Sequence, residues 1–278
     1  MKRYTKADME KFRLDEFGHL ICPTGDYSLI SGFGEYCKFD ARCTFGRWSR
    51  FGESCSFGEN CSFDRYCSFA TSCNFGNNCR FGEGCRFGVR CIFGEYCSFD
   101  GGCRFGDLCR FGDCCNFGER CNFGKDCSFG QDCSFGTNCN FGGNCGFDEV
   151  CSFNDCCSFG ERCSFGEQCS FGERCSFVEQ CSFGAWSSFG EWCHFGKGCS
   201  FEAGKVQNGT YFACDRIGSE RRKTYFFRDG DGNMFVRAGC WFSSLDEFVE
   251  RVKEAHGGTK YEKEYLAAVE LAKIVLEG

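Results

Sequence analysis

The chain has 278 residues and a formal net charge of −7, and it contains 37 Phe, 39 Gly, 31 Cys and a single Pro. The mildly acidic balance disfavours nucleic acid or a membrane as a direct partner, and no segment reaches the apolar length of a transmembrane helix. The odd number of cysteines and the absence of an apolar signal-peptide core at the N-terminus predict a cytosolic protein with reduced thiols, not a secreted disulfide scaffold.

The first 20 residues are predicted to form an N-terminal cap with a helix over residues 4–18. Thr5 and Asp8 have the spacing of a capping box. The apolar side of this helix would consist of Met9, Phe12, Leu14 and Phe17. A cap is expected because the end of a repetitive fold exposes core side chains and strand edges.

Residues 21–203 repeat with a period of six. Phe occupies every sixth position from Phe33 to Phe201, 29 times in register, and Ile21 and Tyr27 hold the same phase. Cys stands two residues before almost every Phe, so strand alternation places Cys and Phe inside and the residue between them outside. Gly follows Phe in 21 of the 29 repeats and is replaced mostly by Asp or Asn, residue types that tolerate a left-handed backbone. A short strand and a corner every six residues predict an all-β solenoid.

The repeated word Phe-Gly-Glu-Arg-Cys-Ser resembles the motif of the hexapeptide-repeat left-handed parallel β-helix superfamily. That resemblance implies three hexads per coil, and hence about ten coils over roughly 46 Å at ~4.8 Å per strand spacing. A right-handed helix of the pentapeptide type is the alternative fold, but its period is five.

Residues 204–278 are predicted to form a small α+β domain. Residues 210–217 and 223–240 alternate like strands, with a hairpin turn at 229–232. Ser244 with Glu247 would begin a helix that Gly257 ends, and Thr259 with Glu262 would begin a second helix. The stretches Ile217-Gly218-Ser219, Gly239-Cys240-Trp241, Leu245-Asp246-Glu247-Phe248, His256-Gly257 and Glu264-Tyr265 resemble the C-terminal domain of uncharacterised phage and prophage β-helix proteins. This resemblance implies a phage or prophage origin and brings no catalytic residue with it.

The sequence predicts no catalytic residue, no metal site and no cofactor. The best-known hexapeptide proteins are acyltransferases with a catalytic His beside a loop that interrupts a coil. Here the repeat is uninterrupted and contains one outward His, His194. Residues 229–233 resemble the start of an EF-hand loop but lack its closing Glu, and the Cys ladder has neither CxxC spacing nor His. An acyltransferase that uses His194 stays open as an alternative.

Corner aromatic residues are candidates for a protein-binding surface. Trp48, Tyr66 and Trp192 share one edge in an eighteen-residue phase, and Tyr96 and Trp186 share another. Several aromatic residues on one edge are typical of an interface, either with a different protein or within a homo-oligomer. Cys114 and Cys156 fall at corners on different edges and are expected to be free thiols.

Charge divides the repeat into two halves. From Phe33 to Lys125 there are 11 acidic and 12 basic residues, the latter including Arg80, Arg86, Arg104 and Arg110. From Asp126 to Phe195 there are 10 acidic residues and only two basic ones. The phase stacks acidic residues on three edges, namely Asp155, Glu173 and Glu191 on the first, Glu149 and Glu167 on the second, and Glu161 and Glu179 on the third. The second half then carries about one net charge per 2.4 Å of axis at the strand spacing, against about 1.7 Å for B-DNA.

These observations favour a non-enzymatic binding or scaffold protein, located in the cytoplasm of a host cell. Its acidic surface would engage a protein partner as a nucleic-acid mimic that blocks a host nucleic-acid-binding or defence protein. A plain solvated surface would also explain the charge. An ice- or polysaccharide-binding rod is a further alternative, suggested by the outward residues Ser164, Ser170, Ser176 and Ser182.

Overall fold

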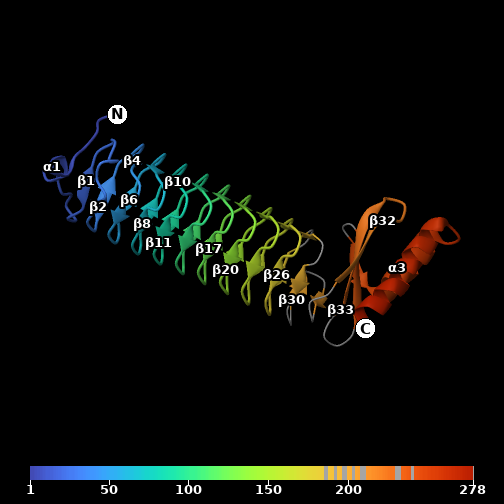
Figure 1. Cartoon of the computed structure of the whole chain (residues 1–278). Coiled ribbons are helices and arrows are strands. Elements are labelled where there is room, and N and C mark those ends of the chain that lie inside the picture. Colours follow the sequence, from blue (N-terminus) through green and yellow to red (C-terminus); the bar gives the residue numbers. More distant parts are fainter. Residues whose placement is uncertain are drawn as a thin grey trace.

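The computed structural model describes residues 1–184, 187–190, 193–195, 199–201, 204–206, 211–228, 233–238 and 241–277. It is a rod of stacked coils, with the short helix α1 (Lys6–Met9) at the N-terminal end and a small domain at the other end (Figure 1). From β2 to β30, each strand of the rod pairs in parallel with the strand three positions away along the chain, so each coil has three sides. The predicted all-β solenoid is therefore confirmed, with about nine coils.

Three sheets run along the rod. The ten-strand sheet contains β2 (Gly32–Phe33), β5 (Arg50–Phe51), β8 (Ser68–Phe69), β11 (Arg86–Phe87), β14 (Arg104–Phe105), β17 (Asn122–Phe123), β20 (Asn140–Phe141), β23 (Ser158–Phe159), β26 (Ser176–Phe177) and β29 (His194–Phe195). The nine-strand sheet contains β4 (Thr44–Phe45), β7 (Ser62–Phe63), β10 (Arg80–Phe81), β13 (Ser98–Phe99), β16 (Asn116–Phe117), β19 (Ser134–Phe135), β22 (Ser152–Phe153), β25 (Ser170–Phe171) and β28 (Ser188–Phe189).

The third sheet has 12 strands, of which the last is antiparallel. It contains β1 (Leu20–Cys22), β3 (Cys37–Phe39), β6 (Ser56–Phe57), β9 (Asn74–Phe75), β12 (Ile92–Phe93), β15 (Arg110–Phe111), β18 (Ser128–Phe129), β21 (Gly146–Phe147), β24 (Ser164–Phe165), β27 (Ser182–Phe183), β30 (Cys199–Phe201) and β31 (Gly204–Val206).

The Phe side chains form three columns in the core. Within a column the rings stack in parallel, as between Phe99 and Phe117, whose centroids lie 4.8 Å apart at an interplanar angle of 2°. Between columns the rings meet edge to face, as for Phe111 and Phe117 at 5.0 Å and 88°. Both are favourable arrangements of aromatic quadrupoles when the parallel rings are offset. The unbroken Phe register thus builds one continuous core.

The cysteine thiols hydrogen-bond to the backbone of the preceding coil. The thiol of Cys115 donates to the carbonyl of Gly94 at 3.4 Å, and that of Cys121 to the carbonyl of Asp100 at 3.7 Å. In the described coils no backbone N–H donates to the carbonyl of the residue after Phe, so the thiol supplies a donor there. Ser49 replaces Cys at this position, and its Oγ donates to the Gly46 carbonyl of its own coil at 2.8 Å. Every cysteine that the structure describes is a free thiol, as predicted.

The glycine after Phe is needed for close approach and not for a left-handed backbone, which corrects the sequence interpretation. A Cβ added to Gly118 would lie 2.5 Å from the backbone nitrogen of Gly101 in the preceding coil. The left-handed residue is instead the one before Cys, such as Arg120 (φ 58°) and Val150 (φ 61°). The repeat therefore places ordinary side chains in a backbone region that suits Gly and Asn.

The N-terminal end is less helical than predicted. The capping box is present, with Asp8 Oδ2 accepting from Thr5 N at 2.8 Å and from Thr5 Oγ1 at 2.7 Å, but the helix has only four residues. Leu14 and Phe17 are 64% and 76% exposed, so they do not form the expected apolar side. The ring of Tyr4 stacks on Tyr27 at 5.0 Å and closes the first coil.

The predicted start of the repeat at Ile21 is also wrong. In β1 it is Cys22, not Ile21, that pairs with Phe39. A register slip of one residue moves a side chain to the other face of a sheet, and accordingly Cys22 is fully buried. The Phe phase begins at Tyr27, whose ring stacks on Phe45 at 5.5 Å.

The C-terminal domain is a four-stranded antiparallel sheet with two helices. The sheet contains β32 (Tyr211–Ile217), β33 (Arg222–Arg228), β34 (Met234–Ala238) and β35 (Trp241–Ser244), and the helices are α2 (Leu245–His256) and α3 (Lys260–Glu277). The predicted capping box of α2 is present, whereas β35 was not predicted. The predicted turn at 229–232 lies outside the described residues.

One side of this sheet covers the last coils of the rod. Phe227 belongs to the same buried cluster as the Phe columns, and the Tyr225 hydroxyl donates to the Phe189 carbonyl at 2.8 Å. On the other side, Phe226 packs with α2 and α3. The described part of the chain contains no helix long and apolar enough to cross a membrane.

Candidate protein-binding surface

Acidic side chains form rows because the corner residues repeat in phase with the coils. We call Asp155 and Glu173 row 1, Glu161 and Glu179 row 2, and Glu149 and Glu167 row 3. Within a row the residues are one coil apart, and the Phe rings beneath them are 4.8 Å apart for Phe153 and Phe171. All six side chains are exposed. The predicted stacking of acidic residues is thus present in the geometry, whereas Glu191 lies outside the described residues.

Rows 1 and 2 border one face of the rod. Row 1 lies at the corner before β23 and β26, and row 2 lies at the corner after them. The outward residues of these strands are Ser158 and Ser176, whose hydroxyl groups are 3.3 Å apart. Two lines of carboxylates therefore run along the rod with a low, polar surface between them.

The acidic residues in these rows are free of ion pairs. None of the six has a Lys or Arg nitrogen within 4.0 Å in the part of the chain that the structure describes. Arg162 lies among them, but its Nε donates to Gln180 Oε1 at 2.9 Å. Their charge is therefore available to a partner.

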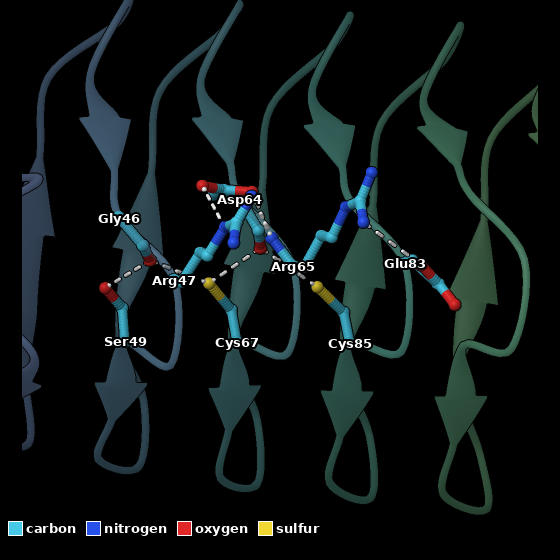
Figure 2. A network of polar contacts seen from close by, with 8 residues as sticks. All are labelled: Gly46, Arg47, Ser49, Asp64, Arg65, Cys67, Glu83 and Cys85. Atoms are coloured by element: carbon cyan, nitrogen blue, oxygen red, sulfur yellow. Dashed lines mark hydrogen bonds and ion pairs between the residues drawn. The ribbon is translucent and has the colours of Figure 1, made fainter.

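In the first half of the rod, some of the acidic residues form ion pairs with arginines. Arg47 Nε lies 3.3 Å from Asp64 Oδ2, and Arg65 Nη1 lies 3.6 Å from Glu83 Oε2. Figure 2 shows these pairs following one another along a corner, above the thiol of Cys67, which donates to the Asp64 carbonyl at 3.0 Å. The two halves thus differ in pairing as well as in net charge.

Asp155 also has a structural role. Its Oδ1 accepts a hydrogen bond from the backbone N–H of Glu173, one coil further on, at 2.8 Å. Asp107 and Asp113 make the same bond to Lys125 and Gln131, at 2.8 and 2.9 Å. From the sequence, this position was considered only for its charge, and the repeated Asp or Asn there was the available signal of its structural role.

Row 3 lines a shallow groove of about 620 Å³. Glu149 and Glu167 lie along it beside Asp148 and Ser182. This groove lies on the twelve-strand sheet side of the rod, away from the face between rows 1 and 2.

The corner aromatic residues are present at the N-terminal end of the rod. Trp48 and Tyr66 stack with their centroids 4.6 Å apart and are 61% and 38% exposed. They lie at the same corner as row 1, about six coils away. Trp186 and Trp192 lie outside the described residues.

The other sequence candidates contribute no assembled site. Cys114 and Cys156 are half-buried free thiols on different corners. His194 begins β29, and its side chain is outside what the structure describes. The described hexads continue without an inserted loop from β2 to β28.

Comparison with known proteins does not place this chain in a family. No family model, no curated protein and no solved structure matches the chain. The function must therefore be argued from the surface itself.

Proposed function

We propose that this protein is a non-enzymatic binding rod whose acidic coils engage a basic, nucleic-acid-binding protein in place of nucleic acid. The proposal rests on rows 1 and 2, which lie on the two borders of one face. Their carboxylates form no ion pair in the part of the chain that the structure describes. A groove shaped for a nucleic acid recognises lines of negative charge at regular spacing, largely through Lys and Arg. Row 1 (Asp155 and Glu173) and row 2 (Glu161 and Glu179) each offer such charges at an interval of one coil.

The cellular setting is part of the same proposal. The partner would be a host nucleic-acid-binding or defence protein in the cytoplasm of the host cell. The proposed phage or prophage origin rests on the pattern of the C-terminal domain alone. Direct binding of nucleic acid or of a membrane is not expected from the net charge of −7.

Capture from a host lysate tests the proposal. The bait is the full chain, and the matched variant is Glu161→Gln with Glu173→Gln and Glu179→Gln, which removes charge but leaves the Asp155 hydrogen bond in place. The control variant carries Glu35→Gln, Glu53→Gln and Glu59→Gln in the other half. We expect basic proteins to bind the full chain and the control, to be released by salt, and to be displaced by double-stranded DNA.

Two outcomes would contradict the proposal. One is equal capture by both glutamine variants, which would point to Trp48 and Tyr66 as the better surface. The other is a captured protein that DNA does not displace. Transfer of an acyl group from a common donor, lost in His194→Ala, would instead support the acyltransferase alternative.

The outward serines support the alternative, a polysaccharide-binding rod, less strongly than the acidic rows support the proposed function. Outward hydroxyl groups are partly engaged with each other, as between Ser158 and Ser176. In the nine-strand sheet the Ser134 hydroxyl likewise donates to Asn116 Oδ1. Binding to an insoluble polysaccharide that survives high salt would favour this alternative over the acidic rows.

A further inference from the structure

Two arginines face each other on the ten-strand sheet without a counter-ion. Arg86 in β11 pairs directly with Arg104 in β14, and the Phe rings of these strands are 4.8 Å apart. Both side chains are exposed, and neither has a carboxylate oxygen within 4.0 Å among the described residues. Like charges directly opposite on neighbouring strands are destabilising, so this pair gains stability from any anion that covers it.

The matching anions lie on the same face of the rod. Rows 1 and 2 border the ten-strand sheet at β23 and β26, four coils from β11 and β14. The arginines and the carboxylates repeat at one coil spacing, because both follow the same backbone. A second copy therefore offers carboxylates at the spacing at which this copy offers guanidinium groups.

We propose that two copies of this chain associate in antiparallel orientation through their ten-strand sheets. In one register, a two-fold axis passes between Asn122 of β17 and Asn140 of β20. Arg104 then lies opposite Ser158 of the second copy, and Arg86 lies opposite Ser176. Each long side chain meets a short one.

This register also places each arginine between two carboxylates. Arg104 lies between Asp155 and Glu161 of the second copy, and Arg86 lies between Glu173 and Glu179. At the axis, Asn122 faces Asn140, whose amide already donates to Asn122 Oδ1 of its own chain at 3.2 Å. A parallel arrangement would place Arg86 against Arg86. The antiparallel register avoids this and gives both arginines carboxylate partners, and it sets Glu83 opposite Glu173 and Asp107 opposite Glu161 at the corners.

The contact is small. It extends over five coil steps, about 24 Å at the strand spacing, and is only one sheet wide, which is below the size of a standard protein interface. We therefore expect a weak, salt-dependent dimer. The inference does not depend on the proposed function, but a partner protein bound to rows 1 and 2 would compete with the second copy.

Analytical ultracentrifugation of the full chain alone tests the proposal. We expect a monomer–dimer equilibrium at 50 mM NaCl that shifts to monomer at 500 mM NaCl. Arg86→Glu with Arg104→Glu should weaken the dimer at least about tenfold, as should Glu161→Lys with Glu173→Lys and Glu179→Lys. A chain that carries both sets of changes should dimerise again, because the charges are exchanged and not removed.

A control pair separates this contact from a general effect of charge. Arg50→Glu in β5 and Arg80→Glu in β10 change the net charge equally, but the register gives neither residue a carboxylate partner. The proposal is overturned by a monomer at 200 µM chain in low salt, by equal weakening in the control, or by failure of the combined variant to dimerise while its thermal midpoint is unchanged.

Discussion

At the scale of single residues, the repeat combines a favourable core with an unfavourable corner. Almost every hexad buries a Phe and a Cys, and its corner holds one residue at positive φ, from Tyr36 to Gln180. Most of these residues are neither Gly nor Asn. Each such conformation costs on the order of 1 kcal/mol or more. Burial of the core side chains offsets this conformational cost, because the core contribution recurs in every hexad just as the corner does.

Val150 offers a test of this corner strain. It is a β-branched residue at φ 61° and is 43% exposed. Val150→Asn should raise the free energy of unfolding by about 1 kcal/mol, since Asn tolerates the left-handed region. Denaturant unfolding measures the change. Val178 is 51% exposed and is not at positive φ, so Val178→Asn should give no gain, and an equal gain would refute the explanation.

The buried thiols predict a loss of stability at alkaline pH. Hydrogen bonding to the neighbouring thiol of Cys37, together with burial, raises the pKa of Cys55 to about 12, and the thiol of Cys55 and burial do the same for Cys73. Below the ordinary thiol pKa of about 8.5 both states keep their protons, so this stability is fully present. Between about pH 8.5 and 12 only the unfolded chain releases them, and stability falls as pH rises.

The urea midpoint in reducing buffer at pH 7.5, 9 and 10 should therefore decrease steeply. Each buried thiol contributes up to about 1.4 kcal/mol per pH unit once the unfolded thiol is ionised. The variant with Cys55→Ala and Cys73→Ala should show a shallower decrease. A midpoint that stays constant to pH 10 would show that the ladder thiols ionise in the folded protein.

At the scale of elements, the backbone N–H groups of each hexad find carbonyl acceptors in the neighbouring coils. Asn116 N–H donates to the Cys97 carbonyl, Gly118 N–H to the Phe99 carbonyl, and Arg120 N–H to the Thr137 carbonyl, at 2.8–2.9 Å. Two of these bonds point to the preceding coil and one to the next. A strand of only two residues is stable here because the corners pair as well as the strands.

Asp155 tests the contribution of a side chain to this corner pairing. Asp155→Ala removes the acceptor for the Glu173 N–H and should lower the free energy of unfolding by about 0.5–1.5 kcal/mol. Asp155→Asn keeps an oxygen acceptor and should cost much less. Glu161→Ala, at the same position of the next corner but without such a bond, should be neutral within about 0.5 kcal/mol. Denaturant midpoints that are equal for the two Asp155 variants would contradict this role.

The period of six was sufficient to predict the coil, because alternation in a strand decides which side chains face inward. The Phe columns and the buried Cys ladder followed from it. The capping box of Ser244 and Glu247 followed separately from the spacing of those two residues. The left-handed corner was misplaced, because Gly after Phe has two explanations and only the distance to the preceding coil separates them. At the N-terminus, Ile21 was misassigned because a slip of one residue leaves no trace in composition.

The contacts between surface residues were harder to predict from the sequence than the packing of the core. The phase correctly stacked Asp155 with Glu173 and Trp48 with Tyr66. The same phase also contains the placement of Arg86 and Arg104 on the sheet that rows 1 and 2 border, because Arg86, Arg104, Ser158 and Ser176 are separated by multiples of eighteen residues. Ion pairs such as Arg65 with Glu83, however, depend on side-chain direction, which the period does not specify.

At the scale of the whole molecule, the stability of the rod is expected to add up coil by coil along its axis. Each coil contacts mainly its two neighbours, so stability is expected to be a sum of coil and interface contributions. Deletion of residues 109–126, one complete coil, should leave a cooperatively folded rod that is shorter by about 4.8 Å. Small-angle scattering and thermal unfolding measure this, and deletion of five residues, 109–113, is the control that should unfold the chain. An unfolded coil deletion would show that the ends depend on total length.

The stacked rings of Phe87 and Phe105 have a consequence for how the rod is made. Every finished coil presents the same phenyl platform and the same unpaired backbone groups to the chain that follows, so it is a template for the next layer, as in crystal growth. The exposed end of the rod is the same after a shift of eighteen residues. A coil that packs in the wrong register, one coil too early or too late, therefore meets an equally favourable surface. The Tyr4–Tyr27 stack marks where the first layer belongs, at the N-terminal end of the rod. Growth from that end during synthesis therefore keeps the layers in order, whereas a complete chain diluted from denaturant begins at many equivalent places.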